Sequence, residues 1–213
     1  KPYPVTLNQI FRLWLPLAGS WLLMSIESPM LSAFVARMAT PEITLASWGS
    51  LVYPISLAIE GPIIMLLTAS TALTENRKAY NKLFKYMVIM SIVLSLIHFL
   101  LAFTPLFYFL ADGLMNVPDE LLEPGRIGLQ IMTPWTIMIA WRRLNQGVMI
   151  KYGNSKSVAI GTVIRLVALV FVLSYGKWFT SLSGIIVGSS AVAIAVTVEA
   201  LYAHSAVQKI LNH

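Results

Sequence analysis

The chain has 213 residues, of which 57% are hydrophobic and only 11% are charged. Soluble globular domains carry about 25% charged residues, so this composition excludes a protein whose surface faces mainly water. The net charge of +6 would suit a nucleic-acid-binding protein, but the basic residues are sorted along the chain in the manner of membrane proteins. There is no cysteine, which excludes disulfides, thiolate metal sites and a cysteine nucleophile.

Six stretches are long and apolar enough to cross the roughly 30 Å hydrocarbon core of a bilayer as helices. In chain order they are residues 7–37, 43–73, 80–111, 121–150, 157–173 and 182–210. Polar segments with Gly or Pro separate most of them, and Thr40-Pro41-Glu42 predicts a capped helix start with proline in the first turn. Gly61-Pro62 and Pro134 lie within spans and predict kinks. We therefore predict one all-α integral membrane domain over residues 1–213, a bundle of six transmembrane helices.

Lysine and arginine are concentrated on one side of this topology, which contains both termini and the loops after the second and fourth spans. These basic residues are Lys1, Arg12, Arg77, Lys78, Lys82, Lys85, Arg142, Arg143, Lys151, Lys156 and Lys209. The other side holds Arg37, Arg126 and Lys177, together with the acidic residues Asp112, Asp119, Glu120 and Glu123. Because loops rich in Lys and Arg stay in the cytoplasm, we predict a multi-pass protein of the inner (plasma) membrane with both termini cytoplasmic.

Several ionisable residues lie inside the predicted spans, where a charge that faces lipid costs roughly 2.5–3.5 kcal/mol on insertion scales. Glu27 lies deep in the first span, Glu60 lies midway along the second beside Gly61-Pro62, and Arg165 lies near the middle of the fifth. We expect these side chains to point into the bundle, to pair with one another or to line a water-filled cavity. They are candidates for substrate binding or ion coupling.

Arg142 and Arg143 lie in the cytoplasmic half of the fourth span, with Asn145 and Gln146 just after them. Arg143, Asn145 and Gln146 complete the candidate substrate and coupling site. The alternative to a functional role is a structural one, in which Glu27 and Glu60 each form an ion pair that only holds helices together. Arg12, Arg142 and Glu199 lie nearer helix ends and could extend to the membrane interface.

The Gly61-Pro62 pair is a candidate hinge, because proline removes a backbone donor and kinks a helix, and such breaks often lie near transporter binding sites. Signatures of enzymes are missing: the sequence has no phosphate-binding glycine loop, no zinc-protease motif and no nucleophile elbow. His98, His204 and His213 are too scattered to predict a metal site. We expect a protein that is not an enzyme and that uses no cofactor, with H+ or Na+ as a coupling ion.

The start of the chain resembles that of multidrug and toxic compound extrusion (MATE) transporters. The resemblance lies in Leu13-Trp14-Leu15-Pro16-Leu17-Ala18, then Phe34-Val35-Ala36-Arg37-Met38, then Leu45-Ala46. Ala36 stands where that family has glycine, and the family's first-helix acid corresponds to a position near Leu31, one turn after Glu27. The chain is also similar to progressive-ankylosis-type proteins of the same superfamily, with a Leu-Pro-Leu opening followed by a glutamate near Glu27. Gly61-Pro62, Ala140-Trp141 and Ile150-Lys151-Tyr152 contribute to this similarity.

The resemblance implies a transporter built from two lobes of six helices each, which exports small organic ions or drugs by alternating access. The present chain is then one lobe, which assembles as a homodimer or faces a second lobe elsewhere in a longer protein. The basic residues favour an organic anion, whereas Glu27 with Trp21 would suit a cationic drug. One alternative is a flippase for lipids or lipid-linked sugars, whose cationic cavity would be formed by Arg12, Arg142, Arg143 and Arg165. The other alternative is a non-transporting scaffold subunit.

Overall fold

The computed structural model describes residues 6–212, and all regular structure in this range is helical. The helices are α1 (Leu7–Val35), α2 (Pro41–Ser47), η1 (Trp48–Val52), α3 (Tyr53–Leu73), α4 (Arg77–Phe103), α5 (Leu106–Tyr108), η2 (Phe109–Leu114), α6 (Asp119–Met132), α7 (Trp135–Lys151), α8 (Ser155–Phe179) and α9 (Gly184–Leu211). The prediction of an all-α fold is confirmed. Lys1, one of the basic residues used to predict the orientation, lies outside the described residues.

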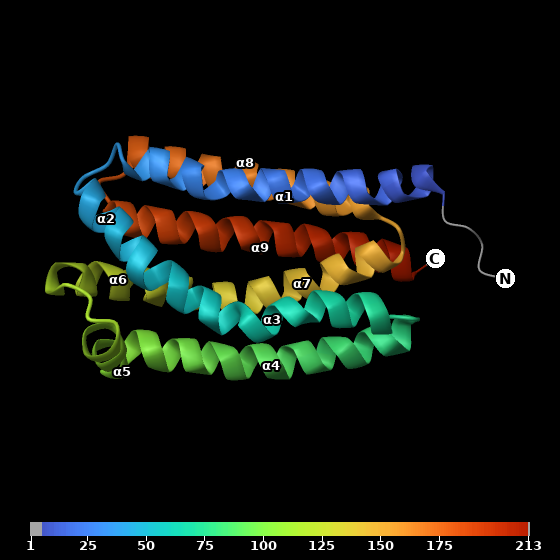
Figure 1. The fold of residues 1–213 in the computed structure, drawn as a ribbon, viewed down its shortest axis with the longest axis horizontal. Helices are drawn as coiled ribbons and strands as arrows, with labels where there is room; N and C mark the ends of the chain where they lie inside the picture. Colours follow the sequence, from blue (N-terminus) through green and yellow to red (C-terminus); the bar gives the residue numbers. More distant parts are fainter. Residues whose placement is uncertain (1–5, 213) are drawn as a thin grey trace.

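The long helices run side by side along one axis and alternate in direction (Figure 1). The start of α1, the α3–α4 turn, the α7–α8 turn and the end of α9 lie at one end of the bundle, on the right of the figure. The α1–α2 turn, the segment from α5 to α6 and the α8–α9 connection lie at the opposite end. The segments that were assigned to one side because of their basic residues therefore meet at one end of the molecule.

Four helical segments are long and apolar enough to cross a membrane: Pro41–Leu73, Arg77–Phe103, Ser155–Phe179 and Gly184–Leu211. These segments identify a multi-pass membrane protein. The first of them combines α2, η1 and α3, which run as one uninterrupted helical stretch. The predicted spans 43–73, 157–173 and 182–210 correspond to three of these segments. The segment that matches 157–173, α8, is longer than predicted.

In two other predicted spans the helix is interrupted or ends early, and a proline accounts for each difference. Span 80–111 was wrong at its end, because α4 stops at Phe103 and Thr104 is extended before Pro105; a residue before proline disfavours the helical conformation. Span 121–150 is two helices, α6 and α7, interrupted at Thr133 and Pro134. Proline cannot donate the backbone hydrogen bond that would continue α6.

Helix α3 continues through Gly61 and Pro62 without interruption. The irregular part of this segment is the π-helix η1, which precedes α3. Helix α2 begins at Pro41 as predicted, but Thr40 has a left-handed backbone (φ 48°) and its side chain makes no capping hydrogen bond. A π-helical turn widens a helix locally and is common at functional sites.

Small residues let the helices of the bundle approach closely. A Cβ atom added at Gly147 of α7 would lie 1.8 Å from Ser70 Oγ and 2.4 Å from the Leu67 carbonyl oxygen of α3. The Thr71 hydroxyl donates a hydrogen bond to the Gly147 carbonyl oxygen at 3.2 Å. Small residues at helix crossings are typical of membrane bundles, where dispersion and hydrogen bonds replace the hydrophobic effect.

Gly147→Ala is expected to destabilise the protein, because the Leu67 carbonyl cannot move away without a shift of α3. Overpacking of this kind costs about 1–3 kcal/mol. Thermal unfolding in detergent should show a lower midpoint than the wild type. Gly19→Ala in α1 is the matched control, because nothing lies within 4 Å of its added Cβ; an equal loss in both variants would contradict the close packing of α3 on α7.

Single cysteines will test the predicted orientation, since the chain has no cysteine of its own. Glu75→Cys in the α3–α4 turn and Lys156→Cys at the start of α8 should be protected from a membrane-impermeant thiol reagent in intact cells. Glu120→Cys, at the opposite end of the bundle, should react. All three positions are exposed. Labelling of Glu75→Cys and Lys156→Cys with protection of Glu120→Cys would reverse the orientation, and labelling of all three would exclude the topology.

Candidate functional site

A cavity of about 530 Å³ lies between α1 and α3, and side chains of η1, α6, α7, α8 and α9 complete its walls. The residues that line it are Trp21, Met24, Ser25, Glu27, Ser28, Leu31, Trp48, Gly49, Tyr53, Ser56, Leu57, Glu60, Ile64, Met132, Trp135, Ile139, Arg142, Arg143, Arg165 and Val192. Most of these side chains are apolar or aromatic, and the charged ones come from α1, α3, α7 and α8. This combination of apolar walls and few charged groups is typical of small-molecule sites.

Two ion pairs line the cavity and join helices that are distant in sequence. Arg143 of α7 donates from Nη2 to Glu60 Oε1 of α3 at 3.1 Å. Arg165 of α8 donates from Nη2 to Glu27 Oε2 of α1. The structure therefore brings together Glu27, Glu60, Arg143 and Arg165, four of the residues that the sequence marked as candidates.

A third ion pair lies deeper, between α7 and α9. Arg142 Nη1 donates to Glu199 Oε2 at 3.0 Å, and both side chains are only 1% exposed. The other carboxylate oxygen of Glu199 accepts a hydrogen bond from Gln146 Nε2 at 3.0 Å. Arg165 Nη1 lies 3.7 Å from Glu199 Oε2, so this pair is connected to the pair that Arg165 forms with Glu27.

The interpretation of Arg142 and Glu199 as residues that extend to the membrane interface is wrong. Both lie on the faces through which α7 and α9 pack, so each side chain meets its partner inside the bundle. Burying either charge alone would be costly, but the pair with Gln146 satisfies both oxygens of the carboxylate. Arg12, by contrast, is exposed on α1.

The remaining candidates do not line the cavity. Asn145 is buried and links helices: its Oδ1 accepts from the Tyr80 hydroxyl at 3.0 Å, and its Nδ2 donates to the Trp141 carbonyl at 2.8 Å. Gln146 contacts Glu199 behind the cavity wall. Gly61 and Pro62 are exposed on α3, and their role as a hinge stays a prediction.

The three arginines keep hydrogen-bonding capacity beyond their ion pairs. The Nε atoms of Arg142, Arg143 and Arg165, and Nη1 of Arg165, are buried and have no hydrogen-bond acceptor within residues 6–212. A buried donor without an acceptor is costly, so part of the hydrogen-bonding capacity of each guanidinium stays unused in this arrangement.

Sequence reasoning named Arg142 only among the cationic groups of the flippase alternative, and it assigned no site role to Glu199 or Trp48. The spacing of Arg142 could have indicated its role. Arg142 and Gln146 are four residues apart, so they share one face of α7 and can bind one carboxylate together. Glu199 is surrounded in sequence by small residues of α9, a pattern of close helix packing that would have predicted burial. No sequence signal marked Trp48, which is the first residue of the π-helix η1 and lines the cavity.

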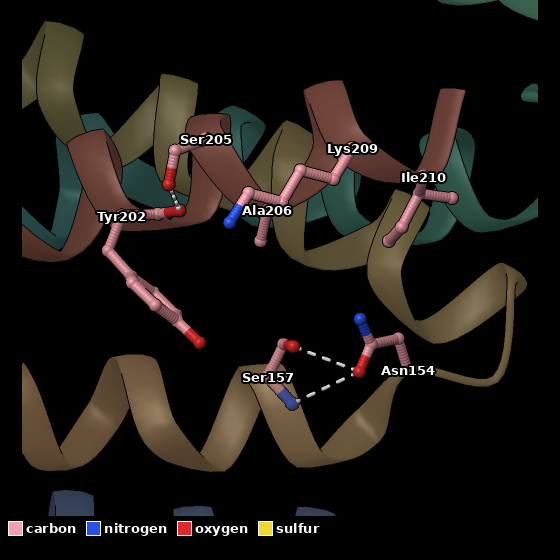
Figure 2. A pocket seen from close by; sticks show the side chains of 7 residues that line it. All are labelled: Asn154, Ser157, Tyr202, Ser205, Ala206, Lys209 and Ile210. Carbon is pink, nitrogen blue, oxygen red and sulfur yellow. Dashed lines mark hydrogen bonds between the residues drawn. The ribbon is translucent and has the colours of Figure 1, made fainter. Parts of the chain in front are cut away.

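A second, smaller cavity of about 290 Å³ lies where α8 begins and α9 ends (Figure 2). Its lining residues are Asn154, Ser157, Tyr202, Ser205, Ala206, Lys209 and Ile210. Asn154 Oδ1 accepts hydrogen bonds from the backbone N–H and the hydroxyl of Ser157, and so caps α8. None of the candidate residues from the sequence lies in this cavity.

A comparison with protein families gave a match to the family described as progressive ankylosis protein (ANKH), over residues 4–177. No curated protein and no solved structure gave a match. The matched region includes Glu27, Glu60, Arg142, Arg143 and Arg165 and ends before Glu199. The cavity-lining charges are thus all within the matched region.

Glu199→Gln is expected to be the most destabilising of the carboxylate-to-amide changes. It leaves Arg142 buried beside Arg165 without a negative charge, and breaking a buried pair costs about 3–5 kcal/mol. Glu27→Gln should cost less, because its side chain is 13% exposed at the cavity. Thermal unfolding in detergent would measure both, with Glu75→Gln in the exposed α3–α4 turn as the control. A larger loss for Glu27→Gln than for Glu199→Gln would contradict this ranking.

Proposed function

The chain belongs to the progressive ankylosis protein family, and on this premise we propose that it is a membrane transporter for small organic ions. The proposal places substrate binding in the cavity between α1 and α3. Glu27, Glu60, Arg143 and Arg165 are its binding and coupling residues, with H+ or Na+ as a coupling ion. Asn145 and Gln146 support this site from behind, by holding α4 and α9 against α7.

One observation supports this proposal above all: ionised groups line a sizeable cavity within a bundle of apolar helices. Charged side chains inside a membrane are rare, and they mark substrate or ion pathways more often than not. Buried pairs that only held helices together would not need to face a cavity. Here two pairs do face it, and their arginines have N–H groups without acceptors.

In this proposal the bundle is one six-helix lobe of a MATE-like transporter. Its six passes would be α1, the α2–η1–α3 segment, α4, the α6–α7 pair, α8 and α9. The cavity-lining Trp21 and Tyr53 are 67% and 55% exposed, so the side of the cavity between α1 and α3 is uncovered. A second lobe, either another copy in a homodimer or a further part of the protein, would close this side and alternate access to the substrate.

A flippase for lipids or lipid-linked sugars is the second candidate. It is favoured by the same uncovered side, because apolar Leu57 and Trp21 are exposed next to cationic Arg143 and Arg165. A lipid tail could then remain in the membrane while its anionic head group enters the cavity. In the scaffold alternative the ion pairs would only hold helices together, and no substrate would be moved.

Transport in proteoliposomes is the test, with a panel of labelled organic anions, cationic drugs and lipid-linked sugars. Arg143→Gln and Arg165→Gln should lower the initial rate about tenfold or more, since a lost charge-assisted hydrogen bond costs roughly 1.5–3 kcal/mol. Arg12→Gln, which removes an exposed arginine of α1, should leave the rate unchanged.

Each variant is to be compared with the wild type for thermal stability before the assay, so that loss of transport is separated from loss of folding. Movement of lipid-linked sugars alone would favour the flippase. Wild-type protein that moves none of the compounds would contradict the transporter proposal, and full activity in both cavity variants would exclude these arginines from the substrate site.

A further inference from the structure

The smaller cavity, between α8 and α9, lies at the depth of lipid head groups. Helix α9 has 28 residues, and at the helical rise of about 1.5 Å per residue it spans ~42 Å. A bilayer with its head-group regions is about 40–45 Å thick, so the last turns of such a helix lie among head groups. The cavity is lined by Asn154 and Ser157 at the start of α8 and by the last turns of α9. It therefore meets the head groups of one leaflet.

Hydrogen-bond donors without acceptors surround this cavity. Asn154 Oδ1 accepts from the backbone N–H and the hydroxyl of Ser157, so the Nδ2 group of Asn154 points the other way, toward the cavity (Figure 2). The Ser205 hydroxyl is already used, because it donates to the Tyr202 carbonyl at 2.7 Å. Within residues 6–212, the Asn154 amide N–H groups, the Tyr202 hydroxyl and the Lys209 ammonium have no acceptor. These three groups are available to a ligand that accepts hydrogen bonds.

Tyr202 closes the cavity on the side of the membrane interior. Its side chain extends from α9 toward α8, with the hydroxyl directed at Ser157 (Figure 2). A Cβ atom added at Gly161 of α8 would lie 3.4 Å from Tyr202 Cδ1, so the absence of a side chain there lets the ring lie against α8. Gly161 is one helical turn further into the membrane than Ser157. The ring therefore forms the floor of the cavity, and the polar groups face the head-group side.

The charge at this end of the bundle is positive. Lys209 lines the cavity, and Lys156 is exposed in the first turn of α8. Of the nine acidic residues in the chain, only Glu75 lies in the turns at this end. Lys209 forms no ion pair in the part of the chain that the structure describes. This end is predicted to face the cytoplasm, where basic pockets between transmembrane helices bind anionic head groups.

Exposed apolar side chains lie beside the cavity, toward the membrane interior. Ile160 of α8, three residues after Ser157, is 49% exposed, and Leu201 of α9, four residues before Ser205, is 53% exposed. Residues three or four apart share a helix face, so each apolar side chain lies one turn from a cavity residue. The volume of about 290 Å³ is at the lower limit of small-molecule sites, so it accommodates a head group but not acyl chains. Polar binding in the cavity and apolar contact beside it are together suited to a lipid.

We propose that this cavity binds the phosphate group of an anionic phospholipid, held by Asn154, Tyr202 and Lys209. Phosphate oxygens accept hydrogen bonds from all three groups, and the bond to the lysine ammonium is charge-assisted. The acyl chains lie in the bilayer against Ile160 and Leu201. A lipid bound in this way joins the start of α8 to the end of α9. The proposal is independent of the transporter proposal, because the cavity between α1 and α3 contributes nothing to it.

Native mass spectrometry of the purified wild-type protein in detergent will test this site, with the apparent Kd of each lipid obtained by titration. Phosphatidylglycerol is the probe, and one tightly retained molecule is expected. Phosphatidylcholine has the phosphate but no net charge, and diacylglycerol has the chains but no phosphate. Both should bind about tenfold more weakly or less, because each lacks the charge that Lys209 binds. Glycerol phosphate, a soluble source of the same group, should also bind more weakly, because it lacks the acyl chains.

Lys209→Gln should weaken the binding of phosphatidylglycerol about tenfold, the loss expected for one charge-assisted hydrogen bond. Tyr202→Phe keeps the ring against Gly161 and removes only the hydroxyl, so the expected loss is about fivefold. Lys82→Gln is the matched control. It removes an exposed lysine of α4 at the same end of the bundle, away from the cavity, and should leave the apparent Kd unchanged. Thermal unfolding in detergent will show whether each variant is folded.

The comparison of ligands on the wild-type protein decides the proposal even if a variant fails to fold. Failure to retain phosphatidylglycerol, or equal binding of phosphatidylcholine or diacylglycerol, would overturn the site. Glycerol phosphate that binds as tightly as phosphatidylglycerol would overturn the assignment to a lipid, because the acyl chains would then contribute nothing. Equal losses in Lys82→Gln and Lys209→Gln would also overturn the site, because binding would then depend only on the general charge of this end.

Discussion

The cost of a charge in a membrane is the constraint on which the arrangement of this bundle depends. Within residues 6–212, six acidic and basic side chains form ion pairs among the apolar helices, and each has its partner on a different helix. Arg165 and Glu199 connect two of the three pairs, so α1, α7, α8 and α9 share one network, and the Glu60 pair ties α3 to α7. Removing one member leaves its partner uncompensated, which makes the relative positions of these five helices mutually dependent.

The apolar helices and most of the charged residues at the cavity could be predicted from the sequence, because both are visible in short stretches of chain. Hydrophobic length predicted the apolar helices, and the isolated charges Glu27, Glu60 and Arg165 stood out against their apolar neighbours. These three residues and Arg143 do meet at one cavity. Their pairing partners could not be predicted, since which face of a helix meets which neighbour depends on the packing of the whole bundle.

The residues whose surroundings were not predicted correctly show what the local sequence does not determine. Arg142 lies beside Arg143 in sequence, but the two side chains point to different partners, Glu199 of α9 and Glu60 of α3, because successive residues diverge around a helix. The interruption of the fourth span at Pro134 was suggested by sequence only as a kink. The π-helix η1 had no sequence signature, although it brings Trp48 to the cavity wall.

The attachment of α7 to the end of α3 has a mechanical consequence. Lys151 Nζ donates to the Ala72 carbonyl at 2.7 Å, and the Tyr152 hydroxyl donates to the Glu75 carbonyl at 3.2 Å. Together with the close contact at Gly147, these bonds join the last turns of the two helices, so a tilt of one would carry the other as a single lever. Its compliant end is the opposite one, where η1 and the break before Trp135 flank the cavity. Any tilt of this lever would pivot near the joined turns and have its largest amplitude at the opposite end, where Trp48 and Trp135 line the cavity.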